Sequence, residues 1–193
     1  MPQLEPGDAL VVVDVQNDFL PGGSLPVPGG EEVLPALNRY LAAFRVAGLP
    51  IFATRDWHPR SHCSFRARGG PWPPHCVAGS EGARFAPGLA LPPSTVIISK
   101  GTALDVDAYS GFQGTDLDER LRAARVRRLF VGGLATDYCV LNTVKDGLAR
   151  GYPTFVLTDA SRAVNVDPGD GLKAEDEMRH LGAVPLRVEL LGG

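Results

Sequence analysis

The sequence predicts a single-domain three-layer α/β/α sandwich whose mostly parallel sheet has six strands. Its length of 193 residues suits one domain. Apolar runs alternate along the chain with segments of helical periodicity. The runs are continuously apolar, which is typical of parallel strands that are covered on both faces. We therefore expect one domain over residues 1–193, with helices on both faces of the sheet.

The first elements of this pattern are two strands with a helix between them. Residues 9–15 (ALVVVDV) and 50–54 (PIFAT) form apolar runs, the first of them rich in β-branched side chains. Residues 31–47 repeat apolar side chains at helical spacing, and Gly48 follows the expected end of this helix.

The same alternation continues to the end of the chain. Thr115 is placed to cap one later helix, and Gly151 follows another. Further strands are expected at residues 95–99, 129–133, 154–157 and 183–190. Further helices are expected at residues 115–124, 137–150 and 171–181.

Composition excludes several classes of protein. The formal net charge of −3 gives no reason to expect a nucleic-acid partner. No run approaches the roughly 18 apolar residues of a membrane span, and the first residues do not resemble a secretory signal. Three cysteines are too few and of the wrong parity for a disulfide framework. We expect a cytoplasmic protein without a membrane partner.

Side chains that can act as a base, a cation or a nucleophile follow the predicted strands. Asp14 closes the first strand, Lys100 follows the third, and Cys139 lies in the first turn of the helix after the fourth. The carboxyl ends of parallel strands share one edge of the sheet, so these groups are expected to converge. A helix N-terminus favours a thiolate. The set predicts acyl transfer by a cysteine nucleophile, with a carboxylate base and a cation that balances their charges.

A second cluster lies in the proline- and glycine-rich segment 55–93, which has no sustained periodicity. Long irregular loops in compact domains usually carry function. Asp56 and His58 are spaced to point to the same side of an extended chain, and a distant histidine would complete a three-ligand metal site. Polar loop residues without a metal, or a zinc site that uses the pairs His62–Cys63 and His75–Cys76, are the alternatives.

Three aromatic residues, Phe19, Trp72 and Tyr109, fall in loops expected to overhang the same edge of the sheet. They are suited to hold a flat ring, although ordinary loop packing would also account for them. Glycine-rich phosphate-binding motifs are missing after the first strand, so we expect no nucleotide or flavin cofactor.

Six segments, in order along nearly the whole chain, give the sequence a family likeness. The chain resembles the nicotinamidase branch of the isochorismatase-like cysteine hydrolases in VDVQNDF (13–19), TRDWHP (54–59), WPPHCV (72–77), SKG (99–101), AYSGF (108–112) and GLATDYCV (133–140). The Asp-x-His pair and the distal histidine are specific to that branch, because its metal-free relatives lack them.

The resemblance implies roles for residues of this chain. It implies a triad of Asp14, Lys100 and Cys139, and an oxyanion hole formed by backbone N–H groups after a cis peptide. The other implied roles are the backbone N–H groups of Ala135 and Cys139 for that hole, Asp56, His58 and His75 for one divalent metal, and Phe19, Trp72 and Tyr109 for the substrate ring. Some relatives place an additional ligand between the pair and the distal histidine, which makes His62 a further candidate. Zinc is the first expectation for the metal, with iron or manganese as alternatives.

The activity implied by the resemblance is hydrolysis of nicotinamide to nicotinic acid and ammonia through a cysteine thioester, in NAD salvage. Pyrazinamide is a second expected substrate, and assembly into a homo-oligomer is left open. Another amidase or an isochorismatase-type hydrolase on the same fold is the alternative enzyme. A metal-binding or partner-binding protein without turnover is the alternative outside enzymes.

Overall fold

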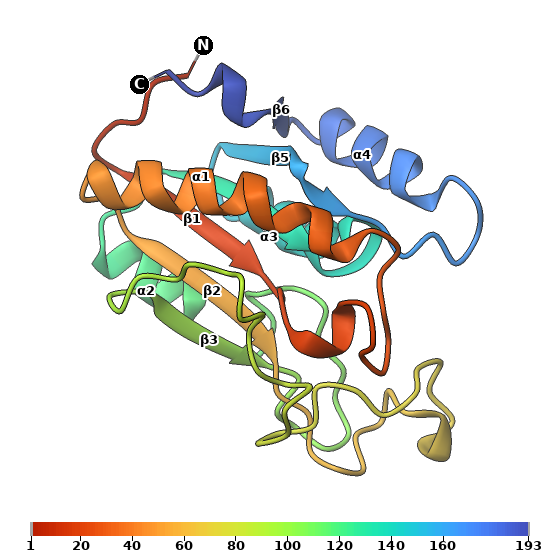
Figure 1. The fold of residues 1–193 in the computed structure, drawn as a ribbon. Coiled ribbons are helices and arrows are strands. Elements are labelled where there is room, and N and C mark those ends of the chain that lie inside the picture. Colours follow the sequence, from red (N-terminus) through yellow and green to blue (C-terminus); the bar gives the residue numbers. More distant parts are fainter. Residues whose placement is uncertain (1, 193) are drawn as a thin grey trace.

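The computed structural model describes residues 2–192, in which six parallel strands form one twisted sheet (Figure 1). The order across the sheet is β3-β2-β1-β4-β5-β6, and every neighbouring pair is parallel. The strands are β1 (Asp8–Val13), β2 (Ile51–Asp56), β3 (Val96–Lys100), β4 (Arg128–Leu134), β5 (Thr154–Arg162) and β6 (Val184–Leu186). The predicted α/β fold class is confirmed.

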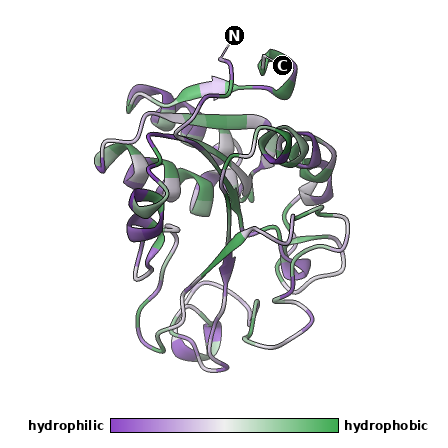
Figure 2. Cartoon of the chain, turned by 90° about the vertical axis from the view of Figure 1, so that its left-hand side faces the viewer, coloured by the Kyte–Doolittle hydropathy of each residue, from purple (hydrophilic) through white to green (hydrophobic). Residues whose placement is uncertain are grey.

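Helices cover both faces of this sheet, so the molecule has three layers (Figure 2). Helix α1 packs on one face, and the other three helices pack on the opposite face. Within residues 2–192 the helices are α1 (Val33–Val46), α2 (Leu117–Ala123), α3 (Leu141–Ala149) and α4 (Asp170–His180).

Strand β1 explains why the strands are apolar without interruption. Leu10 and Val12 pack under α1, whereas Val11 and Val13 face the opposite helical layer. Alternate residues of a strand point to opposite faces, and here each face is covered, so every residue of β1 is fully buried. Burying one such aliphatic side chain stabilises the fold by about 1.5–3 kcal/mol.

The boundaries of most elements differ from the sequence-based expectation by a few residues, and β1, β5 and β6 illustrate the differences. Strand β1 ends at Val13, because Asp14 has a φ of +50° and leaves the extended conformation. Strand β5 continues to Arg162, past a register shift in its pairing with β4. The last strand stops at Leu186, and a short 3₁₀ turn follows.

The strand order reverses between β1 and β4, which are neighbours in space although β2 and β3 lie between them in sequence. In open parallel sheets the crevice beyond the carboxyl ends at such a point is where ligands bind. The long connection between β2 and β3, yellow in Figure 1, lies at this end of the sheet. No helix among the described residues is long and apolar enough to cross a membrane.

Candidate active site

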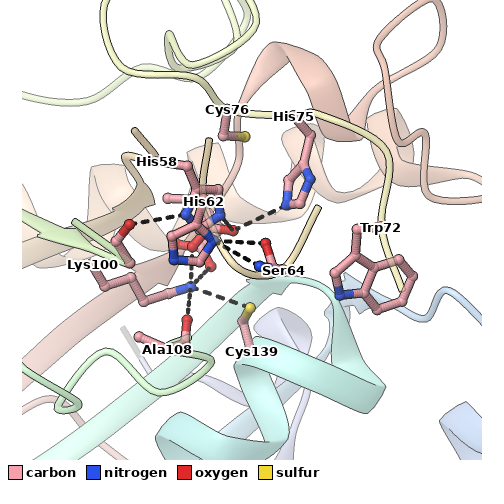
Figure 3. Close-up of polar contacts among 12 residues, drawn as sticks. His58, His62, Ser64, Trp72, His75, Cys76, Lys100, Ala108 and Cys139 are labelled. Carbon is pink, nitrogen blue, oxygen red and sulfur yellow. Dashed lines mark hydrogen bonds and ion pairs between the residues drawn. The ribbon is translucent and has the colours of Figure 1, made fainter. Parts of the chain in front are cut away.

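Asp14, Lys100 and Cys139 converge at the carboxyl ends of β1, β3 and β4, as the sequence predicts. Figure 3 shows the contact between Lys100 and Cys139. The Lys100 Nζ lies 2.8 Å from Asp14 Oδ2 and 3.3 Å from Cys139 Sγ, and it also donates to the Ala108 carbonyl. All three side chains are buried. A buried cation that contacts both a carboxylate and a thiol balances the negative charge that either group carries when it is deprotonated.

One oxygen of Asp14 is fixed and the other is available. The Thr54 hydroxyl donates to Oδ1 at 2.6 Å. Oδ2 faces the Lys100 ammonium, and no donor among the described residues makes a hydrogen bond of good geometry to it. Burial raises the pKa of Asp14, although Lys100 opposes that shift. A raised pKa lies closer to neutral pH, and a general base is most effective when its pKa is near the pH at which it works.

Cys139 lies on a π-helical turn, Thr136–Val140, that leads into α3. The sequence predicts a thiolate favoured by the helix N-terminus. The structure changes that prediction: burial raises the pKa of the Cys139 thiol well above its ordinary value, and Lys100 only partly offsets this. The resting side chain is therefore a neutral thiol. A carboxylate oxygen of Asp14 and the Sγ of Cys139 lie within 4.8 Å of each other.

The backbone before this turn has the features expected of an oxyanion hole. The Leu134–Ala135 peptide is cis, as the family resemblance implies. The Ala135 carbonyl accepts the N–H groups of Tyr138 and Val140 at 3.1 Å, which closes the turn around Cys139. Ala135 and Cys139 both line the cavity beside the triad.

Asp56, His58 and His75 form a group able to hold a divalent metal ion, with ligand atoms that lie within 4.8 Å of one another. The two histidine Nε2 atoms lie 3.6 and 3.9 Å from Asp56 Oδ2. Each ring is held by its other nitrogen: His58 Nδ1 donates to the Gly101 carbonyl at 3.0 Å, and His75 Nδ1 to the Pro73 carbonyl at 2.8 Å. Backbone contacts of this kind leave Nε2 free for a metal, so the donor set fits a zinc-like ion.

Asp56 connects the metal group to the triad. Its Oδ1 lies 2.5 Å from Lys100 Nζ, while Oδ2 faces the two histidines. Burial alone would raise the pKa of Asp56, but Lys100 and His58 outweigh it and hold the pKa well below the ordinary range. This carboxylate is therefore charged at neutral pH, which is the form that coordinates a cation.

His62 lies beside this group, not within it (Figure 3). Its ring stacks on His58 at 4.2 Å between centroids. Both of its ring nitrogens have protein partners: Nδ1 lies 2.7 Å from Ser64 Oγ, and Nε2 lies 3.2 Å from the Val106 carbonyl. Both ring nitrogens of His62 are thus engaged with Ser64 and Val106, and His62 is not part of the group formed by Asp56, His58 and His75.

One cavity is lined by Cys139 and by Asp56 and His75 of the metal group. Trp72 donates from Nε1 to the Tyr109 hydroxyl at 2.9 Å, and the Phe19 ring lies 5.7 Å from that of His75. The structure thus brings together the three aromatic residues that the sequence singled out. It adds four residues to the lining that sequence reasoning missed: Leu25, Val27, Tyr138 and Val164. Tyr138 could have been found from its place directly before Cys139. In the structure its ring packs against that of Trp72, with the ring centroids 5.1 Å apart.

Comparisons with known proteins agree with this geometry. The isochorismatase domain family matches residues 8–189. The chain belongs to this family. It is 40% identical to the nicotinamidase of Escherichia coli K12, over 92% of this chain and 93% of that protein. It is also 40% identical to the nicotinamidase/pyrazinamidase of Mycobacterium tuberculosis, over 89% and 94%.

The solved structures point to the same branch of the family. The crystal structure of the pyrazinamidase of Pyrococcus horikoshii in complex with zinc superposes with a TM-score of 0.91 at 48% identity, and the match covers 94% of this chain and 99% of that one. Sequence and structure therefore place this member of the isochorismatase family in the nicotinamidase/pyrazinamidase branch.

Proposed function

We propose that the protein is a nicotinamidase that hydrolyses nicotinamide to nicotinic acid and ammonia. The observation that carries the proposal is that Cys139 of an Asp-Lys-Cys set lines the same aromatic-walled cavity as Asp56 and His75 of an Asp-His-His group. The named activities of relatives at 40% identity support the same substrate. An aromatic carboxamide fits this cavity with its ring between the aromatic side chains and its amide at Cys139.

The chemistry follows from the protonation states of the triad. As Cys139 Sγ attacks the carboxamide carbon, Asp14 takes the thiol proton, and the N–H groups of Ala135 and Cys139 stabilise the oxyanion. The C–N bond then breaks, Asp14 returns the proton to the departing ammonia, and a thioester remains. A water molecule attacks the thioester, Asp14 accepts its proton, and Cys139 leaves with that proton as the thiol. Lys100 stays charged throughout, because Asp14 and Asp56 outweigh burial and hold its pKa well above the ordinary value.

The metal group acts on the substrate ring. Asp56, His58 and His75 would hold one divalent ion, which when bound supplies a Lewis-acidic position for the pyridine nitrogen and so orients the ring. Zinc suits the two imidazole donors and one carboxylate, with iron or manganese as alternatives. His62 remains a candidate ligand that would have to give up its contact with Ser64 or Val106.

The cellular role follows from the product. Nicotinic acid re-enters nicotinamide cofactor synthesis, which makes the enzyme part of NAD salvage. The three free cysteines among the described residues suit a reducing cytoplasm. Pyrazinamide, a ring carboxamide of the same shape with a nitrogen at the corresponding position, is a second substrate of this cavity.

The test is ammonia release from nicotinamide by the purified, metal-loaded protein, with Cys139→Ala as the matched variant. Wild-type protein should turn over nicotinamide, and the variant should be inactive while it retains its fold and its metal. Substantial ammonia release by Cys139→Ala would rule out Cys139 as the nucleophile. An inactive wild-type protein that binds its metal would rule out the substrate.

A further inference from the structure

Two buried side chains just beyond β1 form hydrogen bonds with the backbone of the metal group, and none of these bonds involves a side chain of the triad. Gln16 and Asp18 are separated by one residue, and both lie against segments that carry the proposed ligands. Neither takes part in the proton transfers described above.

Gln16 grips the backbone of Asp56 on both sides of its α-carbon. Its Nε2 donates to the Asp56 carbonyl at 2.8 Å, and its Oε1 accepts the Asp56 N–H at 2.8 Å. The second hydrogen of Nε2 goes to the Ala83 carbonyl at 2.9 Å. Both hydrogens of Nε2 and the oxygen Oε1 thus have partners. In Gln16→Glu a carboxylate oxygen would replace Nε2 and would face the carbonyl oxygens of Asp56 and Ala83, neither of which can donate a hydrogen bond.

Asp18 holds the loop of the distal histidine. Its Oδ2 accepts the Cys76 N–H at 2.7 Å, directly after His75, and its Oδ1 accepts the Ser24 N–H at 3.1 Å. Cys76 has a φ of +44°, an uncommon conformation for a residue with a side chain, so this short contact fixes a backbone that would otherwise relax.

The two contacts act on the two separate segments that supply the ligands. Asp56 and His58 come from the end of β2, whereas His75 comes from the middle of the long loop. The loop and the strand end also meet directly, through the His58 N–H and the Cys76 carbonyl at 3.0 Å. One rigid segment, residues 16–18, therefore fixes Asp56 on one side and the His75 loop on the other.

We propose that Gln16 and Asp18 are positioning residues that set the separation of Asp56 and His75, so that the metal group is formed before an ion arrives. This inference rests on the proposed function, because it takes Asp56, His58 and His75 as the ligands. Outer contacts that orient ligands typically change metal affinity by roughly 10–100-fold when they are removed.

Asn17 offers a matched control between the two positions. Its amide donates to the Glu81 carbonyl at 2.9 Å, so it ties the same segment to the neighbouring loop. It makes no hydrogen bond to Asp56, His58, His75 or Cys76 in the described structure. Asn17→Ala thus removes a loop contact of the same kind without releasing a ligand.

The experiment measures the zinc dissociation constant of the full-length protein by competition with a chromophoric chelator, without substrate. Gln16→Glu and Asp18→Ala should each weaken zinc binding about 10–100-fold. Asp18→Asn should lose less, because its amide oxygen still accepts the Cys76 N–H. Asn17→Ala should stay within about twofold of wild type. Thermal unfolding of the metal-free proteins shows whether each variant is folded, and a loss of fold stability alone does not change the affinity of molecules that remain folded.

Each result decides the proposal. Zinc affinities within twofold of wild type in both Gln16→Glu and Asp18→Ala would overturn it, and so would an equal loss in Asn17→Ala. If Gln16→Glu does not fold, the uncharged Gln16→Met replaces it, and failure of every variant at both positions to fold would assign the pair to fold stability instead. A wild-type protein that binds no zinc would overturn the proposed metal site and this role together, whereas tight binding by wild type and variants alike would overturn this role alone.

Discussion

Asp14, the proposed base, is held by one hydroxyl and one ammonium. The Thr54 hydroxyl donates to Oδ1, and the Lys100 ammonium, which also contacts Cys139, lies on Oδ2. Thr54 is fully buried and lies next to Val13 across the β1–β2 pair. The orientation of the base thus depends on a residue that is not itself part of the triad.

Replacing Thr54 tests that dependence. Thr54→Val keeps the shape of the side chain but removes the hydrogen bond to Asp14, and a hydrogen bond to a charged group is worth about 1.5–3 kcal/mol. We expect kcat/KM to fall roughly 10–100-fold. Thr54→Ser, which keeps the hydroxyl, should restore most of the activity. Equal losses in the two variants, measured by steady-state ammonia release, would show that packing and not the hydroxyl is what matters.

The Cys139 environment shows what sequence reasoning missed at the level of single residues. The residue order predicts the thiol beside a carboxylate and a cation, and the structure brings these three together. The sequence does not show that burial outweighs Lys100, and so raises the pKa of the thiol. Desolvation depends on the loops that close over the site, which have no periodic pattern to predict them.

At the level of elements, the turn after β3 supports the metal group. Gly101 has a φ of +62°, and a Cβ at this position would lie 2.5 Å from the His58 ring. Its carbonyl is also the acceptor that holds His58 Nδ1. This glycine therefore provides both the backbone conformation and the space that the ring of His58 needs.

Gly101→Ala should displace His58 and lower the metal content of the purified protein. Gly114→Ala is the control, because Gly114 has a φ of +67° and open space around its α-carbon. Both variants carry a similar backbone cost of about 1 kcal/mol, but Gly101→Ala alone should lose metal. Elemental analysis after dialysis measures this, and equal metal content in the two proteins would contradict the role of Gly101.

The sequence predicts the elements better than it predicts how they end. Apolar runs locate all six strands, and the residues that follow them locate the triad and the metal group. The turn of Asp14 out of the sheet and the π-helical turn at Cys139 leave no such pattern, because both are set by contacts between segments distant in sequence. The supporting side chains of Gln16 and Asp18 were missed for the same reason.

At the level of the whole molecule, Lys100 is the shared counter-ion of two buried carboxylates. Its Nζ contacts Asp14 and Asp56, and all three groups are removed from water. Removing one partner of a buried ion pair typically costs 3–5 kcal/mol, because the remaining charge stays buried. The stability of the fold is therefore linked to the protonation of the active site.

Lys100→Met should lower the free energy of unfolding at pH 7 by about 3–5 kcal/mol. In wild type the pKa of Asp56 is below its ordinary value of 3.8, so its contribution is present above that pH and lost as the pH falls below it. In the variant, the pKa of Asp56 should rise above its ordinary value, and that of Asp14, which is already raised in wild type, should rise further. The folded variant then binds protons and gains stability as the pH falls through these raised pKa values. The difference between the two proteins should narrow from pH 7 to pH 5 in urea titrations, and a constant difference would contradict this linkage.

The central claim is that the enzyme hydrolyses a ring carboxamide and that a metal recognises the ring nitrogen of this substrate. Nicotinamide and benzamide differ by a ring nitrogen against a C–H, so walls formed by Phe19, Trp72 and Tyr109 would hold them almost equally. A metal held by Asp56, His58 and His75 would accept the electron pair of a ring nitrogen, which benzamide lacks.

The most direct measurement is kcat/KM for both amides with the metal-loaded enzyme. Sites that require a polar partner reject an analogue without it by roughly 10⁴-fold, against about 10–200-fold for a methylene-sized difference in an apolar pocket. We predict discrimination on the larger scale, lost when His75 is replaced by Ala. Comparable kcat/KM values for nicotinamide and benzamide in the wild-type enzyme would contradict the claim that the metal holds the ring.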